Sequence, residues 1–106
     1  MCIFCKIISK EEPSQIVFEN DQVVAFYDIN PKAPVHILVC PRKHIASMKD
    51  IDEQDGGVLV DMLLSAKKIA REQNIDEGYK LLFNVGRSGG QIIDHIHLHL
   101  MGGWQS

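Results

Sequence analysis

Three histidines alternate with apolar residues near the end of the sequence, as His95, His97 and His99 in the segment DHIHLHLM. The whole chain of 106 residues has only five histidines. Because successive side chains of a β-strand point to opposite faces, the two-residue period predicts a strand with all three imidazoles on one face. The apolar residues between them would face the core. A strand with an apolar back and an imidazole front indicates a chemical site.

Composition limits the class of protein. The length predicts one domain, residues 1–106. The formal net charge of −3 argues against a non-specific nucleic-acid binder, which needs a basic face. No apolar run approaches the ~18 residues of a membrane span, and the N-terminus shows no signal-peptide pattern, so we expect a cytoplasmic protein without a membrane partner. Three cysteines in that compartment do not predict a disulfide framework.

Hydrophobic periodicity predicts the elements of the fold. A helical turn is expected over residues 4–9, and a helix with an apolar stripe over residues 58–70, with Asp55 as its N-cap. Strands are expected over residues 16–19, 23–27, 35–40, 79–85 and 94–101, with a hairpin turn at Asn20-Asp21 and a proline-containing loop over 28–34. This order predicts an α+β fold: an antiparallel meander of about five strands with one long helix and a short N-terminal helix.

The histidine row is too long for one metal ion. Alternate residues of a strand lie about 6.6 Å apart, which puts His95 and His99 roughly 13 Å from each other. A zinc ion needs each ligand atom ~2.0 Å away. The row therefore predicts two separate sites, one able to bind metal and one free for catalysis.

The N-terminal pair Cys2 and Cys5 has the Cys-x-x-Cys spacing of half a structural zinc site. Two further ligands would have to come from elsewhere, and His44 and His95 are the candidates. The alternative is that neither cysteine binds metal: one is a small buried apolar residue, and the other is a thiol in a frayed N-terminus. Cys40, inside an apolar run, is expected to belong to the core.

His97 is the candidate nucleophile. A neutral imidazole that donates one N–H to a carbonyl presents its other nitrogen as a good nucleophile near neutral pH. Attack on phosphorus would give a phosphohistidine type of intermediate. The glycine-rich loop 86–91 could offer unobstructed backbone N–H groups to an anion, although such loops are also common as plain connections.

The segment HIHLHLM resembles the His-φ-His-φ-His-φ-φ signature (φ apolar) of the histidine triad (HIT) superfamily. Further blocks resemble its Hint branch in the same order along nearly the whole chain: IFCKII at 3–8, AFYDI at 25–29, PKAP at 31–34, HILVCP at 36–41, KHI at 43–45 and GGQ at 89–91. The Fhit branch, which hydrolyses diadenosine polyphosphates, fits these blocks less well.

The resemblance implies a purine nucleoside phosphoramidase-like enzyme that cleaves phosphorus–nitrogen bonds in nucleoside 5′-monophosphate conjugates. His97 would form a nucleotidyl-histidine intermediate, and His99 would bond phosphoryl oxygens and assist the leaving amine. Residues of the nucleoside and phosphate subsites are also implied: Asp28 for the ribose hydroxyls; Phe4, Phe26 and Ile29 for the purine; Asn84, Gly90 and Gln91 for the phosphate side.

For each subsite a plainer role remains open. The apolar residues could be ordinary core, Asp28 could stabilise a turn, and Asn84 and Gln91 could lie in a solvated loop. His36, outside the motif, is expected to be a satisfied strand histidine rather than a ligand.

The resemblance also implies a structural zinc held by Cys2, Cys5, His44 and His95, no organic cofactor, and a homodimer formed through the helix and a strand. One position departs from the family: many Hint proteins have serine or threonine after Gly-Gly-Gln, and this chain has Ile92. The departure leaves a second hypothesis open, a zinc-stabilised protein that binds nucleotides or partner proteins with little turnover.

Overall fold

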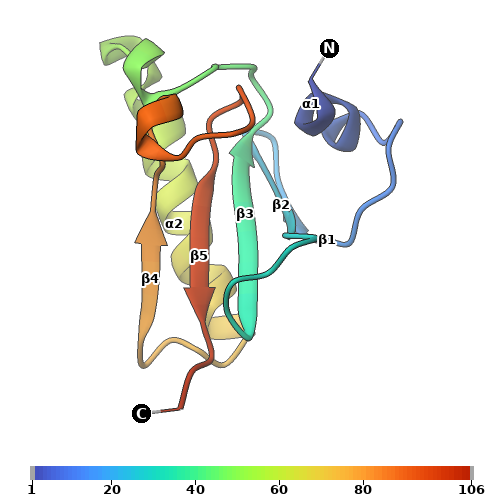
Figure 1. Ribbon diagram of the computed structural model, residues 1–106, viewed down its shortest axis with the longest axis vertical. Helices are drawn as coiled ribbons and strands as arrows, with labels where there is room; N and C mark the ends of the chain where they lie inside the picture. Colours follow the sequence, from blue (N-terminus) through green and yellow to red (C-terminus); the bar gives the residue numbers. More distant parts are fainter. Residues whose placement is uncertain (1, 106) are drawn as a thin grey trace.

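The computed structural model describes residues 2–105, in which five strands form one antiparallel sheet (Figure 1). The strands are β1 (Ile16–Glu19), β2 (Val23–Tyr27), β3 (Val35–Pro41), β4 (Tyr79–Leu82) and β5 (Leu98–Gly102). Their order in the sheet is β1-β2-β3-β5-β4. The expected α+β class is confirmed, but the simple meander is wrong. The long helix carries the chain past the neighbouring position to the sheet edge, and β5 later fills the gap between β3 and β4.

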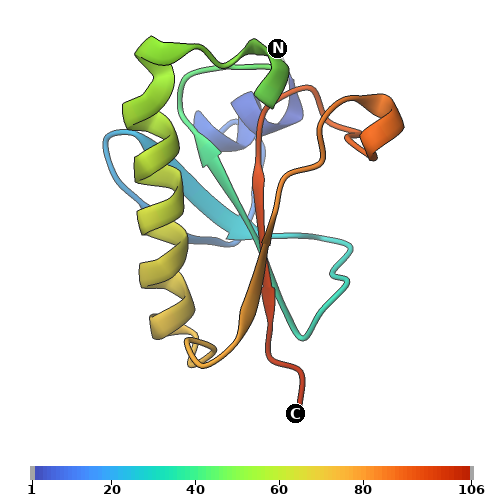
Figure 2. The ribbon, with the colours of Figure 1, turned by 90° about the vertical axis from the view of Figure 1, so that its left-hand side faces the viewer.

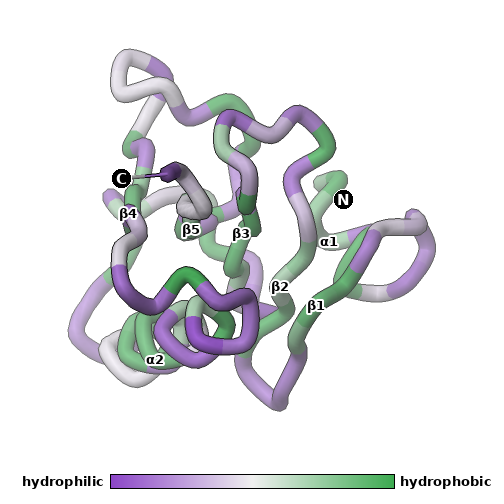
Figure 3. Tube along the Cα trace, turned by 90° about the horizontal axis from the view of Figure 1, so that it is seen from below, coloured by the Kyte–Doolittle hydropathy of each residue, from purple (hydrophilic) through white to green (hydrophobic). Residues whose placement is uncertain are grey.

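The long helix α2 (Gly56–Glu72) covers one face of the sheet (Figures 2 and 3). Its apolar stripe packs in a core cluster with the strand residues that face it: Val23, Ala25, Ile37, Val39, Leu98 and Leu100. The expected helix is confirmed. Asp55 does stand at the N-cap position, but its side chain makes no capping bond to α2. Instead, its carboxylate accepts bonds from Lys43 Nζ at 2.9 Å and from the Asp52 N–H at 3.2 Å.

The short helix α1 (Ile3–Ile8) covers only part of the opposite face. It buries Phe4 and Ile7 against side chains of β2 and β3: Val24, Phe26, Leu38 and Cys40. The register aligns Phe26, Leu38, His99 and Leu82 as one row across β2, β3, β5 and β4. Helix α1 packs against the β2–β3 end of this row, and all four side chains of the row line one cavity.

Two strands are shorter than expected. Residues 94–97 form bends and irregular chain rather than part of β5. At this point the neighbouring strand reaches Pro41, which has no N–H to donate to a ladder. Other bonds replace the ladder there: the Ile96 N–H donates to the Ile45 carbonyl at 2.6 Å. Without a partner beyond Leu98, β4 also ends early, at Leu82.

Three short 3-10 helices lie in the connections: η1 (Met48–Asp50), η2 (Glu53–Asp55) and η3 (Arg87–Gly89). The hairpin at Asn20 is confirmed, because its side-chain oxygen accepts the N–H groups of Gln22 and Val23, both at 2.9 Å. None of the helices within residues 2–105 is both long and apolar enough to cross a membrane.

Candidate functional site

Four sulfur and nitrogen donors meet where α1 approaches the chain ends of β3 and β5. They are the Sγ atoms of Cys2 and Cys5 and the Nδ1 atoms of His44 and His95. All six distances between these atoms fall between 3.1 and 3.6 Å. Ligands placed 2.0–2.3 Å from a tetrahedral zinc ion are separated by roughly 3.3–3.8 Å. The donor set and its shape therefore fit a closed four-ligand metal site.

His95 is fixed for this role by the main chain. Its side chain is fully buried, at 0% exposure, and its Nε2 lies 2.9 Å from the carbonyl oxygen of Pro41. A carbonyl can only accept, so Nε2 carries the proton and Nδ1 presents its lone pair to the cluster. Metal-binding histidines commonly have such a carbonyl partner on the second nitrogen.

The main chain fixes the opposite tautomer of the His97 ring. Its Nδ1 donates to the carbonyl oxygen of His95 at 2.7 Å, which leaves the lone pair on Nε2. Burial lowers the pKa of His97, and the backbone hydrogen bond only partly opposes this effect. The ring is therefore neutral near pH 7, the state that a nucleophile requires.

His99 receives its orientation from His36, which comes from β3. The Lys32 N–H donates to His36 Nδ1 at 2.9 Å, so His36 carries its proton on Nε2 and donates it to His99 Nδ1, also at 2.9 Å. His99 then holds its own proton on Nε2. The Asn84 side-chain nitrogen lies 3.4 Å from this atom, and because both groups are donors, a hydrogen bond here requires the Asn84 amide to turn so that its oxygen accepts. Burial, with the nearby rings of His97 and His36, lowers the pKa of His99 to about 4.

His36 is a satisfied strand histidine, as expected, but it is also part of the site. Sequence reasoning missed this second property. The signal was its position as the single polar residue in the otherwise apolar run 35–40. Burial lowers its pKa as well.

Asp28 has two contacts at the end of β2. Its Oδ1 accepts the Asn30 N–H at 2.8 Å, which is the turn-stabilising role, and its Oδ2 lies 3.5 Å from His36 Nε2. The donors of Asp28, His36 and His99 lie close enough together to suggest a second metal site. The Lys32 N–H argues against it, because it keeps the proton on the His36 nitrogen that would have to bind the metal.

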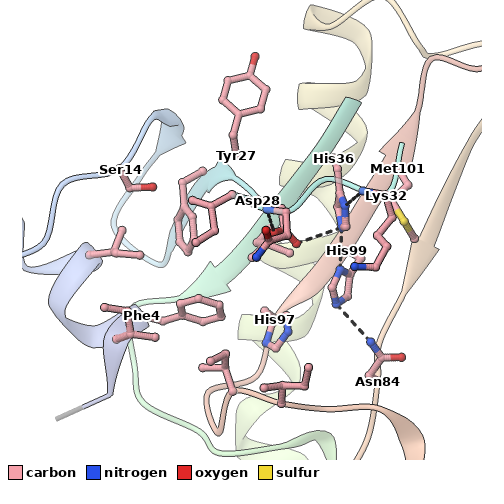
Figure 4. Close-up of a pocket in the computed structure, with 18 of the residues that line it drawn as sticks. Phe4, Ser14, Tyr27, Asp28, Lys32, His36, Asn84, His97, His99 and Met101 are labelled. Atoms are coloured by element: carbon pink, nitrogen blue, oxygen red, sulfur yellow. Dashed lines mark hydrogen bonds and ion pairs between the residues drawn. The ribbon is translucent and has the colours of Figure 1, made fainter. Parts of the chain in front are cut away.

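These side chains border one cavity of about 710 Å³ (Figure 4). Eight of the nucleotide-binding and catalytic residues expected from the sequence line it: Phe4, Phe26, Asp28, Ile29, Asn84, Gly90, His97 and His99. Lys32, Leu82 and Met101 line it too and were not anticipated. Ile29 is 88% exposed and Ile92 is 79% exposed, so both stand at the rim rather than in a core.

Gln91 is not among the residues that line this cavity, and its expected place on the phosphate side stays a prediction. Its side chain is 2% exposed and holds the loop together from inside. Its amide nitrogen donates to the carbonyls of Ala46 at 2.6 Å and Ile93 at 2.9 Å, and its amide oxygen accepts the Gly86 N–H at 3.0 Å. The side-chain amide of Gln91 is thus engaged by main-chain groups of Gly86, Ile93 and Ala46, and it ties the loop to the segment that follows β3.

Comparison with known proteins gives a consistent result. The family described as scavenger mRNA decapping enzyme C-term binding matches residues 1–105. The purine nucleoside phosphoramidase of Escherichia coli K12 is 46% identical over 102 residues, which are 95% of this chain and 86% of that protein. A HIT family hydrolase from Legionella pneumophila Philadelphia 1 superimposes with a TM-score of 0.97 at 48% identity, covering 99% of this chain and 95% of its own.

A Zn-bound histidine triad family protein from Mycobacterium smegmatis superimposes with a TM-score of 0.83 at 29% identity, covering 95% of this chain and 73% of its own. The family match and the superpositions cover nearly the whole chain. The chain belongs to the histidine triad (HIT) superfamily and is Hint-like.

Proposed function

We propose that this protein hydrolyses purine nucleoside phosphoramidates and related nucleoside 5′-monophosphate conjugates through a nucleotidyl-histidine intermediate. The observation that carries the proposal is the 2.7 Å bond from His97 Nδ1 to a main-chain carbonyl, because it reserves Nε2 for attack. The names of two relatives, a purine nucleoside phosphoramidase and a HIT family hydrolase, also support a hydrolase.

In the first step, His97 Nε2 attacks the α-phosphorus and the bond to the leaving amine breaks. The imidazole gains positive charge, and the carbonyl of His95 stabilises it through the same Nδ1–H bond. His99, with its proton on Nε2, donates a hydrogen bond to a phosphoryl oxygen and assists the transfer of a proton from solvent to the leaving amine. The water consumed in the second step returns that proton to solvent. In the second step, water attacks the phosphorus, releases the nucleoside monophosphate and restores His97.

The nucleoside would occupy the end of the cavity next to α1. Phe4 and Phe26 meet edge to face, with ring centroids 5.3 Å apart, and supply an apolar wall for a purine together with Ile29 at the rim. The carboxylate of Asp28 is an acceptor, so it suits the two ribose hydroxyls. Asn84 and Gly90 would border the phosphate beside His99.

The four-donor cluster of Cys2, Cys5, His44 and His95 would hold a structural zinc ion. The two thiols and two imidazoles match the ligands that zinc prefers. When bound, the metal would supply a cross-link and no open coordination position. All three cysteines are free, and we infer a reducing, cytoplasmic compartment.

A second copy of the chain is the proposed partner. Helix α2 leaves Val60, Leu63 and Leu64 exposed, and the adjacent edge strand β4 exposes Leu81. An apolar helix face beside an unpaired strand edge favours burial against an identical surface. We expect a homodimer at micromolar concentration, and a monomeric mass by light scattering would contradict it.

Ile92 favours a second candidate, a nucleotide-binding or regulatory protein with little turnover. It stands 79% exposed on the cavity rim, where many Hint proteins have a hydroxyl, and it offers no hydrogen bond to a leaving group.

Steady-state hydrolysis of a fluorogenic adenosine phosphoramidate by the wild type and by His97→Ala tests the proposal. We expect turnover by the wild type and a loss of at least about 1,000-fold in the variant, since the nucleophile is gone. Circular dichroism checks that the variant is folded. A folded variant with wild-type turnover would overturn the mechanism, whereas AMP binding without turnover by either protein would support the second candidate.

A further inference from the structure

Helix α1 is too short to hold its position by itself. It has six residues, and isolated helices shorter than about 12 residues are marginal in water. Only Phe4 and Ile7 of the helix are buried against the sheet. Something else has to fix the helix, because it forms one wall of the cavity.

The four-donor cluster fixes α1 at both sides of Phe4. Cys2 caps the helix, since its Sγ accepts the Cys5 N–H at 3.2 Å, and Cys5 lies in the first turn. The other two donors belong to the sheet side of the molecule: His44 follows β3 and His95 precedes β5. The cluster thus joins the helix to the chain ends of two central strands.

Phe4 lies between the two cysteines in the sequence and faces the cavity (Figure 4). Its ring meets the His97 ring edge to face, with centroids 5.1 Å apart and planes at 90°. It also contacts His95, at a centroid distance of 6.1 Å, and Phe26. One side chain therefore contacts a residue of the cluster, the candidate nucleophile and the nucleoside wall.

We propose that Phe4 is a positioning residue through which the metal site sets the affinity for the nucleotide. This inference rests on the proposed function. With a metal in the cluster, α1 is held against the sheet and Phe4 closes the nucleoside side of the cavity. Without it, four donors only 3.1–3.6 Å apart lose their common partner. The short helix then moves, and the apolar wall opens.

A thermodynamic cycle that combines one mutation with removal of the metal tests this coupling. Titration calorimetry gives the Kd for AMP with zinc-loaded and chelator-stripped protein, for the wild type and for Phe4→Ala. We expect stripping to weaken AMP binding by the wild type at least tenfold. Phe4→Ala should weaken binding in the loaded state, and stripping should then change its Kd less than threefold. Phe4→Tyr keeps the ring and should restore the metal dependence.

Two variants separate coupling from unfolding. His44 is the exposed ligand, so His44→Ala disturbs the cluster from outside the cavity and should imitate stripping. Far-ultraviolet circular dichroism should show the sheet and α2 intact in every sample. With the phosphoramidate substrate, stripping should raise KM more than it lowers kcat, because the wall contacts the nucleoside.

Three results would overturn the inference: equal AMP affinity with and without zinc, equal weakening of the wild type and Phe4→Ala on stripping, or no zinc bound by the native protein. Failure of the proposed function has a different signature, the absence of AMP binding even by the zinc-loaded wild type.

Discussion

The first and last histidines of the row, His95 and His99, show how one residue type serves two purposes. His95 has no exposed surface, and both its nitrogens contact protein groups, the cluster and the Pro41 carbonyl. His99 is half-buried, with Nδ1 bonded to His36 and Nε2 at the cavity. Under the proposed function, the closed end at His95 stabilises the fold and the open end at His99 binds the substrate. The difference follows from the hydrogen-bond partner of each ring, which is the Pro41 carbonyl for His95 and the His36 ring for His99.

The largest contrast should come from replacing His95 rather than His97. His95→Ala removes a cluster donor and leaves the buried Pro41 carbonyl unpaired, so we expect a loss of about 3 kcal/mol or more in unfolding free energy. His97→Ala removes one hydrogen bond beside the cavity and should cost about 1 kcal/mol. Thermal unfolding of the zinc-loaded variants measures both. Equal destabilisation would contradict the division between a stabilising end and a binding end.

The side-chain amides of Gln91 and Asn84 allow a second comparison between a residue that stabilises the fold and one that borders the cavity. Gln91→Ala leaves the carbonyls of Ala46 and Ile93 without their partner, so we expect a loss of about 2 kcal/mol with KM nearly unchanged. Asn84→Ala is the matched control at the cavity, and it should raise KM with little change in stability. Urea unfolding and steady-state kinetics on both variants give the comparison. A raised KM for Gln91→Ala alone would show that the glutamine does contact substrate.

Acid should destabilise the fold through the open end. The pKa values of His99 and His36 are lowered by burial, to about 4 for His99, so below about pH 6.5 the unfolded chain binds more protons than the folded one. Unfolding free energy therefore falls as the pH drops from 7 toward 4. His99→Asn removes one of these groups and should flatten the decline in urea titrations at pH 7 and pH 5. Parallel curves for the two proteins would speak against this assignment.

The smallest effect is expected at the rim. Ile92 is 79% exposed, so Ile92→Ser should change the unfolding free energy by less than about 0.5 kcal/mol. A hydroxyl near the leaving group would add one hydrogen bond, and about 0.5–1.5 kcal/mol corresponds to roughly a 2- to 12-fold rise in kcat. Steady-state turnover tests it, with Ile92→Val as the apolar control. A rise in both variants would point to side-chain size instead.

Local signals were enough for most of the fold. The Asn20 hairpin, the apolar strand β3 and the stripe of α2 each follow from neighbouring residues, and the structure has all three. The histidine alternation predicted a strand through all three histidines, but β5 begins only at Leu98. Alternation describes where side chains point, whereas a strand also needs a donor opposite, and Pro41 has none.

The site was predictable where residue type determines the role and unpredictable where partners do. The cluster could be predicted because thiols and imidazoles are typical zinc ligands, although Cys2 and His95 are 93 positions apart. The role of His36 depends on the N–H of Lys32, and that of Gln91 on two carbonyls. No side-chain pattern reports such main-chain groups.

Those main-chain groups have a consequence for mutational scanning. The Pro41 and His95 carbonyls and the Lys32 N–H set the protonation of the histidines, and no alanine substitution deletes any of them. An alanine scan of this protein would therefore detect the contribution of the histidine side chains and not that of these main-chain groups. The groups that orient them would emerge from changes to the backbone itself, such as Lys32→Pro or an amide-to-ester replacement at the Lys32 nitrogen, each of which removes the N–H.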